Sequence, residues 1–250
     1  MSTVDPVLLA GLCAIVTAGA CLHRVAGIGL GMVVAPALTL AIGAEAGVTF
    51  SNCAAVVTSV VVLLVLRADV DWPHFWRLAP LIVVGSVLGA VTVRVTAASW
   101  LDVLVGASVL GALAAMPLTR TRFTVHGRTA AMTVGLTAGF LNTTSGVAAP
   151  ALTAYALAIR WEQKSFAATL QPILLTANLS SLVTKAAVGA VPTDLVPWWT
   201  WPLVAGAVCG GVGLGSLLAR RVSSRAAGRL AVTVAAVGAT VALLRGLLAV

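Results

Sequence analysis

Charge is scarce in this chain of 250 residues, because Asp, Glu, Lys and Arg make up 9% of it and hydrophobic residues make up 60%. A soluble domain carries about 25% charged residues, which cover its surface. Soluble enzymes, nucleic-acid-binding proteins and disulfide-rich secreted domains are therefore excluded. With a mean hydropathy of +1.08, the chain is predicted to be a protein of the lipid bilayer.

Chemistry-bearing motifs are also missing. The sequence has no H-E-x-x-H, no G-x-S-x-G and no Asp pair inside an apolar run, and its three histidines lie at the ends of such runs. The four cysteines lie inside apolar runs without C-x-x-C or Cys/His spacing and are interpreted as packing residues. We expect no enzyme activity, catalytic residue, metal or cofactor. The Lys and Arg residues are dispersed singly, so no nucleic-acid partner is expected.

Long apolar segments are what the sequence does contain. The opening letters MSTVD carry no basic stretch, so the run 6–22 is expected to stay as the first helix. Most of the segments reach the roughly 20 residues that span a bilayer. The segments are 6–22, 25–42, 46–66, 76–96, 99–118, 128–142, 146–159, 163–189, 196–219 and 224–248.

The two halves of the sequence resemble one another. The letters APALT at 35–39 return at 149–153, an offset of 114, and AIGAE at 41–45 matches AIRWE at 158–162, an offset of 117. Further on, GSVLG at 85–89 matches GVGLG at 211–215, an offset of 126. Three matches in the same order indicate an internal duplication. We predict a first repeat over 1–119, a cytoplasmic linker over 120–127 and a second repeat over 128–250.

The positions of the basic residues predict how these segments cross the membrane. If all ten segments cross, twelve of the fifteen Lys and Arg residues fall on one side, which is typical of the cytoplasmic side. We therefore predict an all-α polytopic membrane protein with about ten transmembrane segments (8–10) and both termini outside. Five segments per half make the second repeat inverted relative to the first, as in many secondary transporters.

Two segments are interrupted at matching points of the halves. Segment 25–42 contains GIGLG at 27–31 and Pro36, whereas segment 146–159 follows NTTSG at 142–146 and contains Pro150. Broken helices free backbone amides inside the membrane, and amides at a helix N-terminus attract anions. The residues predicted to bind the substrate are Gly29, Gly31, Asn52, Thr144, Ser145, Gly146, Gln171 and Asn178.

Structural alternatives stay open at these positions. The glycines also suit close helix packing, the hydroxyls also bond to nearby backbone, and Asn52, Gln171 and Asn178 also bond to other helices. Lys185, within an apolar run on the non-cytoplasmic side, is expected to extend to the headgroups, the alternative being the outer end of an anion path. Glu45 and Glu162 are expected to complement helix dipoles rather than to carry protons.

Small-residue pairs predict where helices meet. The Gly-x3-Gly patterns at 85–89 and 211–215 are typical of helix contacts within a protomer or between protomers, so a homodimer is left open.

These motifs resemble those of the TauE/SafE sulfite exporter family. The likeness rests on GIGLG at 27–31 with PAL at 36–38, echoed by GFL at 139–141, SG at 145–146 and PAL at 150–152, and it extends over essentially the whole chain. The resemblance implies transport of sulfite or an organosulfonate across the cytoplasmic membrane, commonly as export. The residues alone indicate a small anion held by amides and hydroxyls. The alternatives are a permease for another small anion and a non-transporting membrane scaffold.

Overall fold

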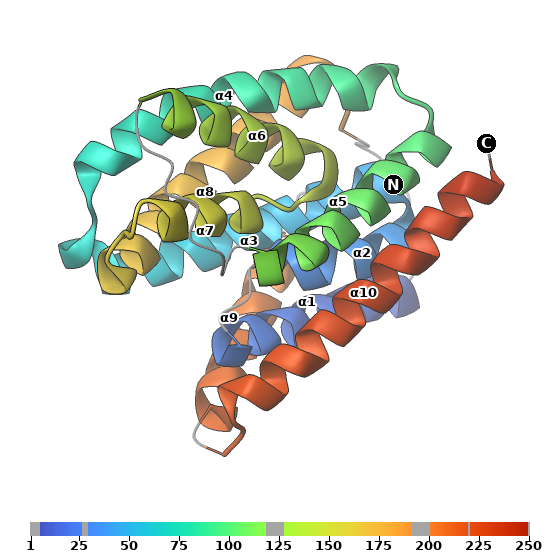
Figure 1. The fold of residues 1–250 in the computed structure, drawn as a ribbon. Helices are drawn as coiled ribbons and strands as arrows, with labels where there is room; N and C mark the ends of the chain where they lie inside the picture. Colours follow the sequence, from blue (N-terminus) through green and yellow to red (C-terminus); the bar gives the residue numbers. More distant parts are fainter. Residues whose placement is uncertain (1–5, 27–29, 119–127, 192–200, 220, 250) are drawn as a thin grey trace.

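The computed structural model describes residues 6–26, 30–118, 128–191, 201–219 and 221–249. Within these residues all the regular elements are helices, which agrees with the predicted all-α class (Figure 1). Gly29 and the predicted linker 120–127 lie outside the described residues. The elements are α1 (Pro6–Ala26), α2 (Leu30–Ile42), α3 (Ala44–Leu66), η1 (Arg67–Asp69), α4 (Trp72–Val95), α5 (Ala98–Leu118), α6 (Arg128–Ser145), α7 (Ala149–Ala158), α8 (Gln163–Ala187), α9 (Trp201–Leu218) and α10 (Ser224–Leu248).

The apolar runs form helices because a helix satisfies its backbone hydrogen bonds within one segment, which lipid cannot do for it. Among the described residues, six helices are long and apolar enough to cross a bilayer, and α2, α7 and most of α9 form shorter apolar helices. The protein is therefore a multi-pass membrane protein.

The helix ends gather on two opposite faces of the molecule. On one face, Arg24 Nε at the end of α1 donates to Ser216 Oγ near the end of α9 at 3.1 Å. Lys164 at the start of α8 forms a 2.8 Å ion pair with Asp69, just after α3. We call this the Arg24 face.

The opposite face, the Arg245 face, holds ends of α2, α5 and α10. Arg245 near the end of α10 forms a 2.8 Å ion pair with Asp102 at the start of α5. Its Nη1 also lies 3.5 Å from the carbonyl oxygen of Leu40, near the end of α2. The ends of α1, α3 and α9 and the start of α8 thus lie at the Arg24 face, and the ends of α2 and α10 and the start of α5 lie at the Arg245 face.

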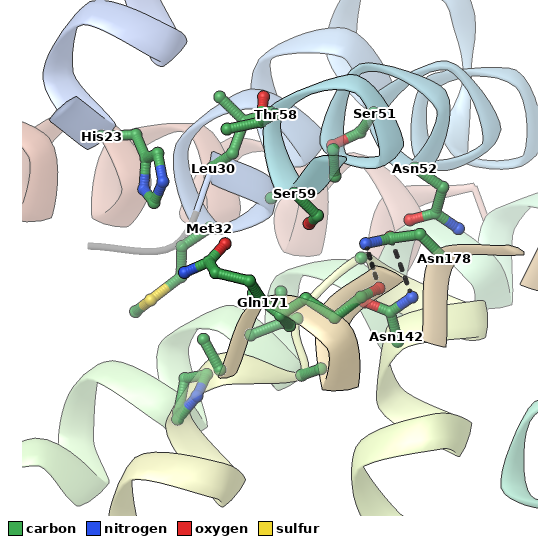
Figure 2. Close-up of a pocket in the computed structure, with 18 residues that line it drawn as sticks. His23, Leu30, Met32, Ser51, Asn52, Thr58, Ser59, Asn142, Gln171 and Asn178 are labelled. Carbon is green, nitrogen blue, oxygen red and sulfur yellow. Dashed lines mark hydrogen bonds between the residues drawn. The ribbon is translucent and has the colours of Figure 1, made fainter. Parts of the chain in front are cut away.

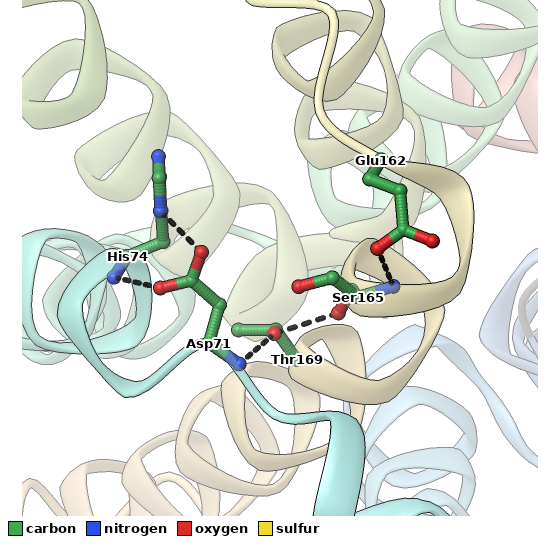
Figure 3. A network of polar contacts seen from close by, with 5 residues as sticks. All are labelled: Asp71, His74, Glu162, Ser165 and Thr169. Carbon is green, nitrogen blue, oxygen red and sulfur yellow. Dashed lines mark hydrogen bonds and ion pairs between the residues drawn. The ribbon is translucent and has the colours of Figure 1, made fainter.

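A network of helix caps fixes α4 against α8 at the Arg24 face (Figure 3). Asp71 caps α4 by accepting from the backbone N–H of His74 at 3.1 Å. The backbone N–H of Asp71 donates to Thr169 Oγ1 of α8 at 2.8 Å. Glu162 caps α8 by accepting from the backbone N–H of Ser165, which agrees with the dipole-complementing role expected for it.

The predicted Gly-x3-Gly contacts lie within the protomer. A Cβ atom at Gly85 would collide with the carbonyl oxygen of Leu136, and one at Gly89 would lie 2.8 Å from Thr143 Cβ, so α4 packs closely on α6. A Cβ at Gly211 would collide with the carbonyl oxygen of Thr17, so α9 packs in the same way on α1. These positions therefore need glycine for close helix approach.

Two helices are too short to cross a bilayer alone. At a rise of about 1.5 Å per residue, α2 and α7 extend over roughly 20 and 15 Å. The break before α7 is confirmed: residues 146–148 are not helical, and Gly146 has a φ of 74°. These two half-helices bring backbone ends into the interior of the fold.

Candidate functional site

The N-terminal ends of α2 and α7 meet in the middle of the molecule. A Cβ at Gly31, in the first turn of α2, would collide with the carbonyl oxygen of Gly146, at the break before α7. Both glycines line one cavity with Ala55, the central residue of α3. The two interruptions predicted from the sequence are therefore in contact, about halfway between the two faces.

The space between the atoms at this meeting point is about 480 Å³ when the open solvent at its mouth is included, and the enclosed part is small. In Figure 2, Ser51, Asn52 and Ser59 of α3 lie opposite Gln171 and Asn178 of α8, and His23 lies at one end. The remaining lining is largely apolar and comes from α2, α7 and the break. The lining residues that carry polar side chains are His23, Ser51, Asn52, Thr58, Ser59, Asn142, Gln171 and Asn178.

Hydrogen bonds, one between α6 and α8 and two within α8, hold the amide side chains in place. Asn142 Nδ2 of α6 donates to Asn178 Oδ1 of α8 at 3.1 Å, and Asn178 Nδ2 donates to the carbonyl oxygen of Leu174 at 2.7 Å (Figure 2). Gln171 Nε2 donates to the carbonyl oxygen of Ala167 at 3.2 Å. This hydrogen bond fixes the orientation of the Gln171 amide.

Ser51 differs from these residues. Its side chain is buried, with 1% exposed, and its Oγ atom has no hydrogen-bond partner among the described residues. A buried hydroxyl without a partner loses its hydration and gains nothing in return. Because Ser51 lines the cavity, a molecule bound there is well placed to supply the missing bond.

Backbone groups complete the binding surface. The first-turn N–H groups of a helix have no acceptor inside the helix, and they carry partial positive charge. The start of α2, at Leu30, Gly31 and Met32, and the start of α7, at Ala149, both line the cavity. The amide of Gly146 itself is not free, because it donates to the carbonyl oxygen of Asn142 at 2.9 Å. The cavity thus offers neutral donors and helix dipoles, which suit a small anion.

The cavity continues toward the Arg24 face. A larger cleft, about 2020 Å³ with the open solvent included, shares Met32, Pro150 and Gln171 with it and reaches Arg24 and Gln163 at the helix ends. Most of the lining of this cleft is apolar.

On the other side the cavity is closed. Ala44, Val48, Val93, Leu101 and Val105 form a buried apolar cluster toward the Arg245 face. Beside this cluster, Asn52 Nδ2 donates to Ser181 Oγ at 2.7 Å and joins α3 to α8. The structure therefore has an access route from the Arg24 face and a seal toward the Arg245 face.

The structure brings most of the residues predicted for the site together. Of the eight, the lining of the cavity includes Gly31, Asn52, Gly146, Gln171 and Asn178.

Thr144 and Ser145 do not belong to this lining. Thr144 Oγ1 donates to the carbonyl oxygen of Phe140 at 2.9 Å, and Ser145 Oγ donates to that of Leu141 at 2.7 Å. Both hydroxyls are engaged by the preceding turn of α6, as the structural alternative expected. The side-chain bond predicted for Thr144 and the backbone-amide contact predicted for Ser145 therefore find no support in the lining of the cavity.

The list of predicted residues omits Ser51 and Asn142, although both line the cavity. Asn142 stands in the NTTSG stretch that marks the break, so its position was a usable signal. Ser51 shares the cavity with Ser59, two helical turns further along α3, a spacing that places two side chains on one helix face.

The position of Lys185 differs from the one expected from the sequence. Its side chain is fully buried, with 0% exposed, and its Nζ donates to Thr49 Oγ1 at 3.3 Å. The prediction that Lys185 extends to the headgroups is wrong, because the side chain packs against α3 in the interior. Glu45 lies in the first turn of α3, where a carboxylate complements the helix dipole.

Among the described residues, there is no group of three His, Cys, Asp or Glu side chains that could hold a metal ion.

Comparison with known proteins identifies the family. No curated protein and no solved structure matches the chain. The family model described as "Sulfite exporter TauE/SafE" matches residues 11–243, which include the cavity and all ten helices at least in part. Together with the multi-pass helical fold, this match shows that the chain belongs to the TauE/SafE sulfite exporter family.

Proposed function

We propose that this protein is a permease of the cytoplasmic membrane that exports sulfite or a small organosulfonate. The carrying observation is the contact between the N-terminal ends of two half-helices, Gly31 of α2 against Gly146 before α7, inside a polar cavity. Paired half-helix ends at mid-membrane are a binding site for anions in secondary transporters. The membership in the TauE/SafE family supports the sulfur oxyanion as the substrate class.

The proposed binding mode uses hydrogen bonds rather than a cation in the cavity. Ser51 Oγ and the amide side chains of Asn52, Gln171 and Asn178 lie around one space, beside the first turns of α2 and α7. An anion with several oxygens accepts several such bonds at once. Hydrogen bonds to a charged group contribute about 1.5–3 kcal/mol each, roughly twice the contribution of neutral ones.

Alternating access is the mechanism we propose. The cavity reaches the Arg24 face through the cleft, and the apolar cluster around Val48 and Leu101 closes it from the Arg245 face. The Arg24 face carries the helix ends with most of the basic residues, so we assign it to the cytoplasm and both termini to the outside. This state would then be open to the cytoplasm, where an exporter loads.

Two inverted repeats, over 1–119 and 128–250, would supply the second state. Several contacts support this proposal. Each of two equivalent contacts joins one repeat to the other: α4 of the first packs on α6 of the second, and α9 of the second packs on α1 of the first, with glycines at matching positions in both. In the loops paired by the sequence match, Gly43 and Arg160 both have positive φ values, 85° and 56°. Exchange of the two halves' conformations would open the cavity to the Arg245 face.

The test is sulfite binding and efflux by the purified full-length protein and by Ser51→Ala. Since Ser51 Oγ has no partner among the described residues, its removal leaves stability unchanged. We expect it to weaken sulfite binding by about tenfold, as loss of one hydrogen bond to an anion would. Thermal shift with sulfite, taurine, phosphate and chloride gives binding, and [35S]sulfite efflux from proteoliposomes gives transport.

Thr176→Val is the matched control on α8, because Thr176 Oγ1 donates to the carbonyl oxygen of Pro172 at 2.8 Å and does not line the cavity. It should bind and transport like the wild type. A wild-type protein that no anion stabilises and that shows no efflux would favour the scaffold alternative and contradict the proposal.

A further inference from the structure

A buried polar stripe runs along α8 from the cavity to the Arg245 face. Its residues follow one another at spacings of seven, three and four, which keep side chains on one helix face. The first two line the cavity and the last lies two residues from the end of α8. The stripe consists of Gln171, Asn178, Ser181 and Lys185, each at most 8% exposed.

A second stripe on α3 faces the first. Asn52 Nδ2 donates to Ser181 Oγ at 2.7 Å, and one turn nearer to the Arg245 face Thr49 Oγ1 accepts from Lys185 Nζ at 3.3 Å. Because α3 and α8 are antiparallel, these pairs continue the polar lining of the cavity beyond Asn178. We call this continuous interface the α3–α8 seam.

Lys185 at the end of the seam is an incompletely paired cation. An ammonium group has three donors, and among the described residues Nζ has one acceptor, which is a neutral hydroxyl. That hydroxyl is itself held by the carbonyl oxygen of Glu45 at 2.7 Å. None of the ion pairs among the described residues includes Lys185. The titratable groups that interact with it electrostatically are Glu45 and Cys53, both on α3.

Other cations of the protein are paired differently. Arg245, at the same face, forms a 2.8 Å ion pair with the buried carboxylate of Asp102. Lys164, at the opposite end of α8, forms a 2.8 Å pair with Asp69 and is exposed. A fully buried ammonium that forms no ion pair with a carboxylate is costly, and in membrane helices such a residue marks an ion pathway.

We propose that Lys185 is the cationic residue of a second anion subsite, which receives the sulfite or sulfonate group when the cavity opens toward the Arg245 face. The inference rests on the proposed function and adds to it a subsite nearer to the Arg245 face. In the present state Thr49 occupies one donor of Lys185, and the seam is closed. On opening, the anion leaves the neutral donors of the cavity, passes the Asn52–Ser181 pair and replaces Thr49 at the ammonium group.

The test compares Lys185→Gln with Lys185→Arg in the full-length protein. Gln can keep a donor for Thr49 but removes the charge, whereas Arg keeps the charge. We expect Lys185→Gln to bind sulfite at the cavity within about threefold of wild type, by thermal shift, and to lose about tenfold or more of [35S]sulfite exchange in proteoliposomes. Lys185→Arg should restore exchange to within about threefold of wild type.

Two further variants separate charge from packing. Lys164→Gln removes a charge from the exposed end of α8 and is expected to exchange sulfite like the wild type. Thr49→Val removes the one hydrogen bond that Lys185 Nζ makes among the described residues. If the role of Lys185 were structural, Thr49→Val would therefore lose as much exchange as Lys185→Gln. Under the proposal, Thr49→Val retains exchange.

Each outcome decides one question. If the wild-type protein exchanges sulfite and Lys185→Gln exchanges it at the same rate, the subsite is overturned but the proposed function stands. Equal losses in Thr49→Val and Lys185→Gln, without rescue by Arg, also overturn it in favour of a packing role. A wild-type protein that neither binds nor exchanges sulfite overturns the proposed function and the subsite together. If Lys185→Gln is unstable, exchange by Thr49→Val and Lys185→Arg at wild-type levels supports the subsite, and its loss in both overturns it.

Discussion

At the scale of single residues, Gly31 is the position where the smallest change should have a large effect. Any Cβ there collides with the backbone carbonyl of Gly146, and backbone cannot rotate away as a side chain can. We expect Gly31→Ala to lower the stability of the purified protein by about 1–3 kcal/mol, the usual range for overpacking, and to abolish sulfite binding. Thermal unfolding and ligand-induced shift measure both effects.

Gly111→Ala is the control for this prediction. A Cβ at Gly111 of α5 meets no atom within 4 Å, so alanine should stabilise the helix by about 0.5–1 kcal/mol. A Gly31→Ala protein as stable as Gly111→Ala would show that the two half-helix ends are not in contact.

The residues of the site show what a sequence can and cannot predict. Gly31, Gly146 and Gln171 were found because interruptions and intramembrane amides are visible in the letters. Thr144 and Ser145 were misplaced because a hydroxyl in a helix is free to bond to the carbonyl of the preceding turn, as both do here. That choice depends on the rotation of α6 against its neighbours, which no local pattern contains.

The prediction for Lys185 was wrong for a related reason. A lysine near a helix end extends to the headgroups when its helix faces lipid, but here that position of α8 faces Thr49 of α3. Spacing alone does predict that Asn178, Ser181 and Lys185 share one face. Only the pairing of α3 with α8 shows that this face points inward.

At the scale of helices, two adjacent glycines of α9 allow a matched experiment. A Cβ at Gly211 collides with the carbonyl oxygen of Thr17 on α1, whereas a Cβ at Gly210 meets nothing within 4 Å. We expect Gly211→Ala to destabilise the protein by about 1–3 kcal/mol through the α1–α9 contact, and Gly210→Ala to stabilise it slightly. Thermal unfolding in one detergent measures the difference, and equal melting temperatures would contradict the packing of α9 on α1.

The helices themselves were largely predictable. The apolar segments coincide with helices because length and hydropathy suffice to define a membrane helix. The ends of the helices were less predictable. The segment predicted to begin at 146 forms a helix only from Ala149, since Gly146 adopts a φ of 74°. The packing partners of the helices depend on tertiary contacts, and the glycine pairs were their only local sign.

At the scale of the whole molecule, the assignment of the two faces can be tested directly. Ala68 lies exposed on the Arg24 face and Ala97 lies exposed on the Arg245 face. In a variant whose natural cysteines are replaced by alanine, we expect Ala97→Cys to react with a membrane-impermeant maleimide in intact cells. Ala68→Cys should react only after permeabilisation. The reverse pattern would place the cleft on the outside and contradict loading from the cytoplasm.

Under the proposed function, the neutral lining of the cavity predicts what drives transport. None of its described lining residues is Asp, Glu, Lys or Arg, so a bound monovalent anion crosses with its charge uncompensated. A membrane potential, negative inside, then acts on the loaded carrier with about 2.3 kcal/mol per 100 mV. This corresponds to a concentration ratio of about fiftyfold in favour of the outside. The resting voltage of the cell would therefore expel sulfite without a coupled proton or sodium ion.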